Sequence, residues 1–331
     1  MDYKQEICKS DKMKLISILI PCYNEAGNLS LLYEHLSAFI NNHSLYQWQI
    51  LLIDDGSKDN SLQIIEEIRK KDQRFCYISL SRNFGKENAM LAGFDHVQGD
   101  CCVIMDADLQ HPIEVIPEML KLWEEGYDDV YAKRKCRGKE SWLRKKLSLS
   151  YYNILQKIAN VDILPNVGDF RLLDRKCINA MIELRETQRY TKGLYCWIGF
   201  NKKEIEFTQG DRTQGTSSFN YHKLINLAIE GITSYSTAPL RISTLLGIIV
   251  SFSAFLYMCY IFIKTIILGE PVHGFPTLII VILFLGGVQL LSLGIIGEYL
   301  GRIFLETKHR PIYLIRKKEG ADIVALFAML V

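Results

Sequence analysis

The chain has 331 residues, and its 39 lysines and arginines nearly balance 37 aspartates and glutamates, for a net charge of +2. This length suits one large domain or two smaller ones, and the near-neutral charge gives no indication of nucleic-acid binding. None of the nine cysteines forms a C-x-x-C pair. That favours reduced thiols in a cytosol-facing domain over a disulfide framework. Segment 1–13 is polar, so we expect no secretory signal.

Short apolar runs alternate with helical patterns from residue 14 to about residue 133. Strands are expected at 15–20, 50–53, 75–80, 101–105 and near Val130, and helices at 28–40, 62–68, 87–97 and 112–122. This alternation predicts an α/β domain with a doubly wound, mostly parallel sheet. Neither a G-x-G-x-x-G after the first strand nor a P-loop motif occurs, which argues against a Rossmann dehydrogenase and a P-loop NTPase.

Polar residues follow each of the first four expected strands. The segments are Pro21-Cys-Tyr-Asn-Glu25, Asp54-Asp-Gly-Ser-Lys-Asp59, Ser81-Arg-Asn-Phe-Gly-Lys86 and Asp106-Ala-Asp108. Each one alone is more typical of a turn or a helix cap. Because parallel strands end at the same edge of a sheet, we expect all four segments to meet in one crevice that binds a ligand.

The segment from Asp106 to Gln110 offers hard oxygen ligands at the end of an apolar strand. Asp106, Asp108 and Gln110 suit Mg²⁺ or Mn²⁺, with a substrate phosphate filling other coordination positions. A solvated turn is the alternative for an isolated Asp-x-Asp. Together with the other strand ends, the segment favours a nucleotide diphosphate held by a divalent cation.

Two uncharged segments near the C-terminus, 245–263 and 277–296, are each long enough to cross a bilayer, which takes roughly 20 residues. The linker between them holds only one cation, Lys264, and Arg241 precedes the first segment. The cations after the second segment are Arg302, Lys308, Arg310, Arg316, Lys317 and Lys318. The positive-inside rule therefore predicts a transmembrane hairpin with both chain ends in the cytoplasm. Two buried core helices are the alternative.

The basic run 133–146 leads into an apolar stripe at helical spacing, and a second stripe precedes the first membrane segment. Both predict amphipathic helices in the membrane interface, with packing onto the sheet as the alternative. Arg134, Arg144 and Ser148 are candidates to bind the phosphate of a lipid acceptor. The expected organisation is a catalytic domain at 14–220, a juxtamembrane helix at 221–240, a transmembrane hairpin at 241–304 and a cytoplasmic tail at 305–331.

Further motifs are Gly168-Asp-Phe-Arg-Leu-Leu-Asp-Arg175, Arg189-Tyr-x-Lys-Gly193, Gly297-Glu-Tyr-Leu-Gly-Arg302 and Arg310-Pro-x-Tyr313. With the four strand-end segments, they resemble family 2 glycosyltransferases with the GT-A fold. Within that family the chain is similar to polyprenyl-phosphate glycosyltransferases, namely bactoprenol glucosyltransferases and dolichol-phosphate mannose synthases. The resemblance extends over residues 16–316, and the hairpin matches the bacterial branch.

The resemblance implies roles for individual residues. The nucleotide-sugar site comprises Pro21, Tyr23, Glu25, Asp54, Asp55, Lys86, Asp106, Ala107, Asp108, Lys192 and Arg212. The implied metal ligands are Asp106, Asp108 and Gln110, and the acceptor-phosphate site is Arg134, Arg144 and Ser148. The implied catalytic residues are Asp108, Asp169 and Arg212.

Asp169 is expected to orient the sugar or the acceptor, because an ionised phosphate needs little help from a base. An ion pair with Arg171 or Arg175 is the alternative for this carboxylate. The family commonly has a lysine where this chain has Ser218, and Arg212 or Lys192 is expected to replace it.

The expected reaction is inverting transfer of one sugar from a nucleotide diphosphate sugar, UDP-linked as in the bacterial branch, to undecaprenyl phosphate. It would serve cell-envelope glycosylation at the cytoplasmic face of a bacterial inner membrane. The resemblance also implies a homo-oligomer, and we expect a flippase and a downstream glycosyltransferase as partners. One alternative is a diacylglycerol or protein acceptor. Another is a catalytically weak nucleotide-sugar-binding scaffold, which Ser218 favours.

Overall fold

A computed structural model describes residues 13–134, 167–187, 189–208 and 274–321, and scattered positions between 240 and 267. The chain divides into two compact units. The first comprises residues 1–153, 161–219 and 311–331, and the second comprises residues 154–160 and 220–310. The two predicted amphipathic helices lie outside the described residues.

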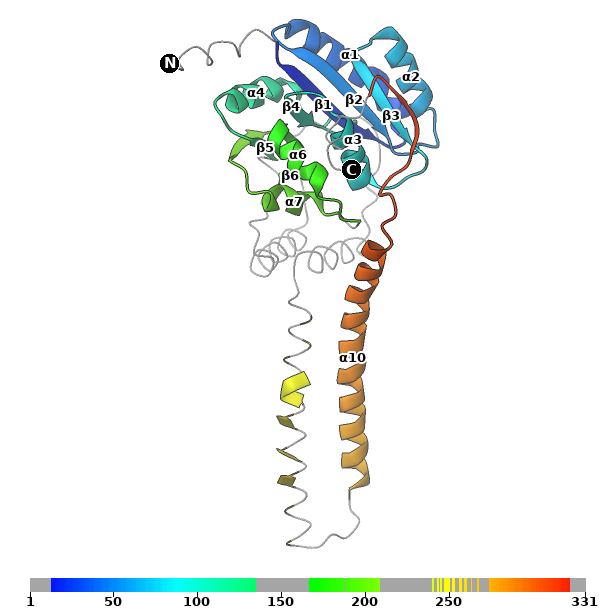
Figure 1. The fold of residues 1–331 in the computed structure, drawn as a ribbon, viewed down its shortest axis with the longest axis vertical. Coiled ribbons are helices and arrows are strands. Elements are labelled where there is room, and N and C mark those ends of the chain that lie inside the picture. Colours follow the sequence, from blue (N-terminus) through cyan, green and yellow to red (C-terminus); the bar gives the residue numbers. More distant parts are fainter. Residues whose placement is uncertain are drawn as a thin grey trace, which may run out of the picture. The chain divides into compact units, whose positions relative to one another are not determined.

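The first unit is built on an eight-stranded sheet in the order β7-β5-β6-β4-β1-β2-β3-β8 (Figure 1). The strands are β1 (Leu15–Cys22), β2 (Gln47–Asp54), β3 (Phe75–Leu80), β4 (Cys101–Ile104), β5 (Asp129–Arg134), β6 (Val167–Asp174), β7 (Lys202–Phe207) and β8 (Ile315–Glu319). Among the described residues of this unit, the helices are α1 (Ala26–Asn42), α2 (Ser61–Lys71), α3 (Lys86–His96), α4 (Ile116–Glu124), α6 (Arg175–Glu183) and α7 (Thr191–Trp197), with a short 3₁₀ turn at Ile113–Val115 before α4.

Helices cover both faces of the sheet. Along α1, Leu29, Leu32, Leu36 and Ile40 are buried at helical spacing, and they pack with apolar residues of α2 and α4 over one face. On the opposite face α3 packs against β1 and β2, and α6 lies beside α3 (Figure 1). Strands buried on both faces need apolar side chains throughout, which explains the continuous apolar runs of β1 to β4. The predicted doubly wound α/β fold is confirmed.

The sheet is mixed, because β6 lies between β4 and β5 and runs antiparallel to both. The strands β1 to β4 pair in parallel, in the order β4-β1-β2-β3. Ile104 at the end of β4 pairs with Arg171 near the middle of β6. An antiparallel strand begins at the edge where its neighbour ends, so the start of β6 lies beside the residues that follow β4.

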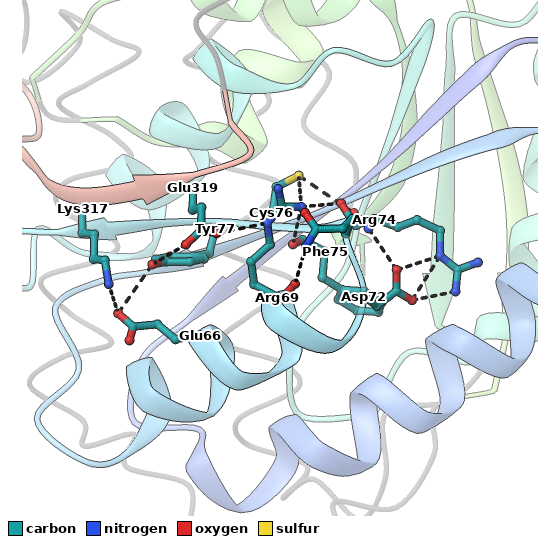
Figure 2. Close-up of polar contacts among 10 residues, drawn as sticks. Glu66, Arg69, Asp72, Arg74, Phe75, Cys76, Tyr77, Lys317 and Glu319 are labelled. Atoms are coloured by element: carbon teal, nitrogen blue, oxygen red, sulfur yellow. Dashed lines mark hydrogen bonds and ion pairs between the residues drawn. The ribbon is translucent and has the colours of Figure 1, made fainter.

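After residue 310 the chain returns to the first unit, where β8 pairs antiparallel with β3 at the edge of the sheet. Ion pairs join β8 to α2, with Lys317 Nζ 2.6 Å from Glu66 and Arg69 Nε 3.7 Å from Glu319 (Figure 2). Every residue of β8 is exposed in the sequence Ile-Arg-Lys-Lys-Glu, which has no apolar alternation. The strand therefore gives no sequence signal, and the strand-to-strand hydrogen bonds hold it in place.

Tyr313 connects the same segment to α3, because its hydroxyl donates a hydrogen bond to the Asp95 carboxylate. This carboxylate also accepts two hydrogen bonds from Arg185. Burial, followed by the Asp95 charge, raises the pKa of the Tyr313 hydroxyl, so it stays protonated as a donor. We predict that Tyr313→Phe lowers the free energy of unfolding by about 1.5–3 kcal/mol, the usual contribution of a hydrogen bond to a charged group. Thermal melting of the wild type and the variant measures this difference in stability.

The matched control for Tyr313→Phe is Tyr33→Phe, whose ring packs edge-on against Phe75 at a centroid distance of 5.1 Å and keeps that contact in the variant. Its melting temperature should stay near that of the wild type. Equal shifts in both variants would contradict a specific role for the Tyr313 hydroxyl.

The second unit contains α10 (Phe275–Thr307). Within it, the 24 residues Phe284–Thr307, which include an 18-residue window with a mean hydropathy of 1.4, are long and apolar enough to cross a membrane. The predicted second span, 277–296, lies inside α10, although this apolar stretch begins and ends further along the helix. The predicted first span, 245–263, lies partly outside the described residues.

Candidate active site

A cavity of about 300 Å³ opens where β1, β2, β3 and β4 end. It is lined by Pro21, Cys22, Tyr23, Glu25, Asp55, Asn83, Gly85, Lys86, Ala89, Asp106, Ala107 and Asp108. All four strand-end segments contribute, as the parallel arrangement predicts. Cys22, Asn83 and Gly85 are not among the predicted site residues, although they belong to the predicted polar segments. Ala89, on α3, had no sequence signal.

Two consecutive carboxylates at the end of β2 have different surroundings. Asp54 is buried, does not line the cavity and accepts a hydrogen bond from the Ser79 hydroxyl at 2.7 Å. Asp55 lines the cavity and accepts from the backbone N–H groups of Phe84 (2.7 Å) and Gly85 (2.9 Å). Asp55 therefore links the segment after β2 to the segment after β3, just before α3 begins.

Gly56 allows these two segments to approach closely. Its φ of +66° lies in the left-handed region, and a Cβ at this position would collide with the backbone of Arg82. Only glycine meets both conditions without strain. The Asp-Asp-Gly sequence is therefore required by the packing of the two loops as well as by the carboxylates.

The loop after β4 carries the predicted metal ligands. The backbone N–H of Asp106 donates to His111 Nδ1 (3.0 Å), and that of Gln110 donates to Asp108 Oδ1 (3.2 Å). Leu109 has a φ of +60°, an uncommon conformation for a residue other than glycine, and such positions cluster at functional sites. These contacts turn the chain so that Asp106 and Asp108 line the cavity, whereas Gln110 is not among the lining residues.

The donor set fits a hard divalent cation. Asp106 and Asp108 are half-buried carboxylates facing one cavity, and Mg²⁺ typically takes one or two carboxylates together with substrate phosphates. Within the described part of the chain, no cluster of three His, Cys, Asp or Glu side chains is arranged to hold a metal ion. A cation at this position therefore requires oxygen ligands from a bound substrate or from an amide such as Gln110.

Lys86, the first residue of α3, bridges two carboxylates. Its Nζ lies 2.6 Å from Asp106 Oδ1 and 2.7 Å from Asp169 Oδ2. Burial alone would lower the pKa of Lys86, but the two carboxylates raise it above its ordinary value. Burial would raise the pKa of Asp169, yet Lys86 and then Lys192 hold it below its ordinary value. Asp169 is thus ionised at neutral pH and is too weak a base to take a proton readily.

The partner of Asp169 is Lys86 and neither of the two arginines considered as its alternative partners. The Arg171 guanidinium forms a buried ion pair with Asp129 at 2.9 Å, and Arg175 donates to backbone carbonyl groups just after α3. Because β6 runs antiparallel beside β4, Asp169 lies at the same edge as Asp106. This proximity depends on strand order, which the sequence pattern does not reveal.

Glu87, the second residue of α3, also belongs to this charged cluster. Its Oε2 accepts a hydrogen bond from the Thr191 backbone N–H at 3.1 Å. Burial, and then the nearby Asp169 carboxylate, raise the pKa of Glu87 to about 7. Glu87 is not among the predicted site residues, although its position directly after Lys86 is a sequence signal that points to it.

We predict that Glu87→Gln stabilises the protein at pH 8. The folded state holds the Glu87 proton up to a pKa of about 7, against an ordinary value of 4.5, so the stability of the wild type falls as pH rises from 4.5 to 7. Glutamine carries no such penalty, and the variant should gain on the order of 1–2 kcal/mol at pH 8. Thermal melting of both proteins at pH 8 and pH 4.5 measures the difference.

The gain in the Glu87→Gln variant should disappear at pH 4.5, where both side chains are neutral. A wild type that is more stable than the variant at pH 8 would show that the ionised carboxylate is favoured by the fold.

Other predicted site residues lie near this cluster or outside the described part. Arg134 ends β5, and its guanidinium lies close to Gly168. Lys192, on α7, interacts electrostatically with Asp169 and Glu87. Tyr23 is 40% exposed at the cavity. The predicted residues Arg144, Ser148 and Arg212, and Ser218, are outside the described residues.

Two family models match the chain. The family model for glycosyl transferase family 2 matches residues 17–181, and the model for the GtrB C-terminal hairpin matches residues 238–303. Together with the apolar helix in α10, the hairpin match indicates that the protein associates with a membrane.

Relatives align over almost the whole chain. The putative glycosyltransferase CsbB of Bacillus subtilis (strain 168) is 48% identical over 307 residues, 92% of either chain. The bactoprenol glucosyl transferase of Shigella phage SfV is 42% identical and covers 92% of this chain and 99% of its own. A solved structure, glucosyl-3-phosphoglycerate synthase from Mycobacterium tuberculosis with Mn²⁺ and UDP-glucose, has 16% identity and a TM-score of 0.44, and the match covers 66% of this chain and 77% of that chain. By these full-length relatives and the matching family model, the chain belongs to glycosyl transferase family 2, as a glycosyltransferase with a GtrB-type C-terminal hairpin.

Proposed function

We propose that the protein transfers one hexose from a nucleotide diphosphate sugar to a polyprenyl phosphate, with inversion at the anomeric carbon. The observation that carries the proposal is the cavity in which Asp106, Asp108 and Lys86 meet residues from the other strand ends. Relatives named bactoprenol glucosyl transferase, matched over 99% of their own length, support both the sugar class and the lipid acceptor.

The donor is proposed to lie in this cavity with its base toward β1 and β2 and its diphosphate toward the loop after β4. Glu25 and Asp55 line the first part, and the half-exposed ring of Tyr23 offers a surface for the base. A UDP-linked sugar is our choice, as the resemblance to the bacterial branch implies.

A Mg²⁺ or Mn²⁺ ion is proposed to be held by Asp106 and Asp108, with Gln110 as a further ligand. When bound, such a cation stabilises the negative charge that develops on the departing nucleotide diphosphate. Lys86 supplies a second positive charge at the same place, since its ammonium group contacts Asp106.

The acceptor phosphate is proposed to attack the anomeric carbon in line. A bond forms between a phosphate oxygen and that carbon while the bond from the carbon to the diphosphate oxygen breaks. Because the attacking oxygen is already ionised near neutral pH, no base is required. Asp169, held by Lys86, orients the sugar or acceptor. Arg134 is proposed to bind the acceptor phosphate together with Arg144 and Ser148.

The reaction is proposed to take place at the cytoplasmic face of a bacterial plasma membrane, with both chain ends in the cytoplasm. The short linker between the predicted spans carries few cations, whereas the residues after α10 carry many. Assembly into a homo-oligomer and cooperation with a flippase and a downstream glycosyltransferase remain predictions.

The test uses the full-length protein in lipid nanodiscs with radiolabelled UDP-glucose, UDP-N-acetylglucosamine or GDP-mannose, Mg²⁺ or Mn²⁺, and undecaprenyl phosphate. We expect a labelled, acid-labile lipid from one donor and its loss on adding a chelator. A parallel reaction contains diacylglycerol as acceptor. Labelling of diacylglycerol alone, or of no lipid with any donor, would overturn the proposal.

A further inference from the structure

We propose that Glu87 is a positioning residue that seats Lys192 beside Asp169 by holding the first residue of α7. The inference rests on the proposed sugar transfer and adds a residue that acts through another. Glu87 reaches from the first turn of α3 to the first turn of α7, which lies 104 residues further along the chain.

The contact satisfies a group that a short helix leaves unpaired. Thr191 is the first residue of α7, and the first N–H groups of a helix have no partner within the helix. Tyr190, at the preceding position, makes no side-chain hydrogen bond to the helix end. Glu87 Oε2 accepts from the Thr191 N–H instead, at 3.1 Å, and Thr191 is buried. The carboxylate of another helix thus caps α7.

The rest of α7 is anchored separately. The Arg171 guanidinium lies over the Tyr195 ring, 3.7 Å from its centroid, and Lys202 Nζ donates to the Tyr195 carbonyl at 2.7 Å. These contacts hold the second half of the helix. Lys192 follows Thr191 directly, so its backbone position depends on the end that Glu87 caps.

α3 also restrains the segment that leads into α7. Near its end, Asp95 forms an ion pair with Arg185 at 2.6 Å, and at its start Glu87 binds Thr191. The same helix therefore fixes both ends of the segment 185–191. α3 begins with Lys86 and Glu87. The same helix therefore positions the Lys86 ammonium group between Asp106 and Asp169 and the Glu87 carboxylate that caps α7.

The effect on the reaction follows from the position of Lys192. Its positive charge helps to keep Asp169 ionised, and Asp169 contacts Lys86, which lines the donor cavity. A displacement of about 1 Å in an active site lowers the rate by up to roughly 10²-fold. Releasing the end of α7 should therefore slow transfer even though Glu87 itself touches no substrate.

Four variants test the inference in the sugar-transfer assay, with melting temperatures recorded to confirm folding. Glu87→Ala removes the acceptor, and Glu87→Gln keeps an oxygen that accepts from Thr191. Thr191→Pro removes the donor at a helix position that tolerates proline, and the fourth variant combines Glu87→Ala with Thr191→Pro. Glu34→Gln, at an exposed site on α1, is the matched control.

We expect Glu87→Ala and Thr191→Pro each to lower kcat on the order of tenfold. Their combination should be no slower than either alone, because both remove the same hydrogen bond. Glu87→Gln should stay within about threefold of the wild type, since the cap is retained. Glu34→Gln should match the wild type.

Three outcomes would overturn the inference: a Glu87→Ala variant as fast as the wild type, equal losses in Glu87→Ala and Glu87→Gln, or additive losses in the double variant. A wild type that labels no lipid would instead contradict the proposed function. Failure of the proposed reaction and failure of the role of Glu87 are therefore separate results.

Discussion

Replacing Asp108 by alanine is expected to lower the initial rate of sugar transfer on the order of 10²–10³-fold. Asp108 lines the cavity together with Asp106, and its Oδ1 accepts a hydrogen bond from the Gln110 backbone N–H at 3.2 Å. Its carboxylate therefore lies in the cavity proposed to hold the cation and the donor diphosphate. Loss of this charge should weaken cation binding and the stabilisation of the departing nucleotide diphosphate.

Two measurements check the Asp108→Ala prediction. The first is the initial rate of lipid labelling at saturating donor and metal. The second is the rise in melting temperature on adding Mn²⁺ with UDP, which should be present in the wild type and absent in the variant. Glu118→Gln, at an exposed site on α4, is the control and should behave as the wild type in both. An Asp108→Ala protein that equals the wild type would refute the metal site.

Asp169→Asn is expected to lower kcat on the order of 10²-fold, by a similar factor at every pH between 6 and 9. The pKa of Asp169 is held below its ordinary value, mainly by Lys86, so the carboxylate is ionised throughout this range. If Asp169 only orients the substrate, its substitution lowers kcat at every pH and leaves the shape of the pH profile unchanged. If Asp169 were a general base, its substitution would also remove the acidic limb of the profile.

The pH profile of kcat for Asp169→Asn therefore separates the two roles of this residue. If the acidic limb of the wild-type profile vanishes in the variant, Asp169 acts as a base and our reading of its pKa is wrong. Asp129→Asn is not a suitable control because Asp129 is buried in an ion pair with Arg171. Asp59→Asn is better, since Asp59 does not line the cavity and bonds to the Ala26 N–H and to Ser61 at the starts of α1 and α2.

The alternation of apolar runs and helical patterns was sufficient to predict β1 to β5 and α1 to α4. Strands buried on both faces must be apolar throughout, and helices on a sheet must carry an apolar stripe. β8 has neither property: all five of its residues are exposed, and pairing with β3 defines it. Such a strand cannot be recognised from residue type, because its stability comes from backbone hydrogen bonds to a distant segment.

The candidate site divides in the same way. Residues at the ends of β1, β2 and β4 could be predicted to meet because parallel strands share one edge. Asp54, however, is not among the residues that line the cavity, and it accepts a hydrogen bond from Ser79. Adjacent residues of a strand point to opposite sides, and the sequence Asp-Asp does not reveal which of the two faces the cavity.

By itself the sequence determined the α/β class, the polar edge with its Asp-x-Asp segment and the apolar C-terminal segments. Each of these depends on local pattern, namely side-chain periodicity, strand direction and length without charge. Only the tertiary structure decided that Lys86 joins Asp106 to Asp169 and that Glu87 caps α7. Lys86 and Asp169 are 83 positions apart and Glu87 and Thr191 are 104 positions apart, and the antiparallel strand inserted beside β4 brings Asp169 to this edge. No local pattern encodes strand order, because it results from the packing of the whole sheet.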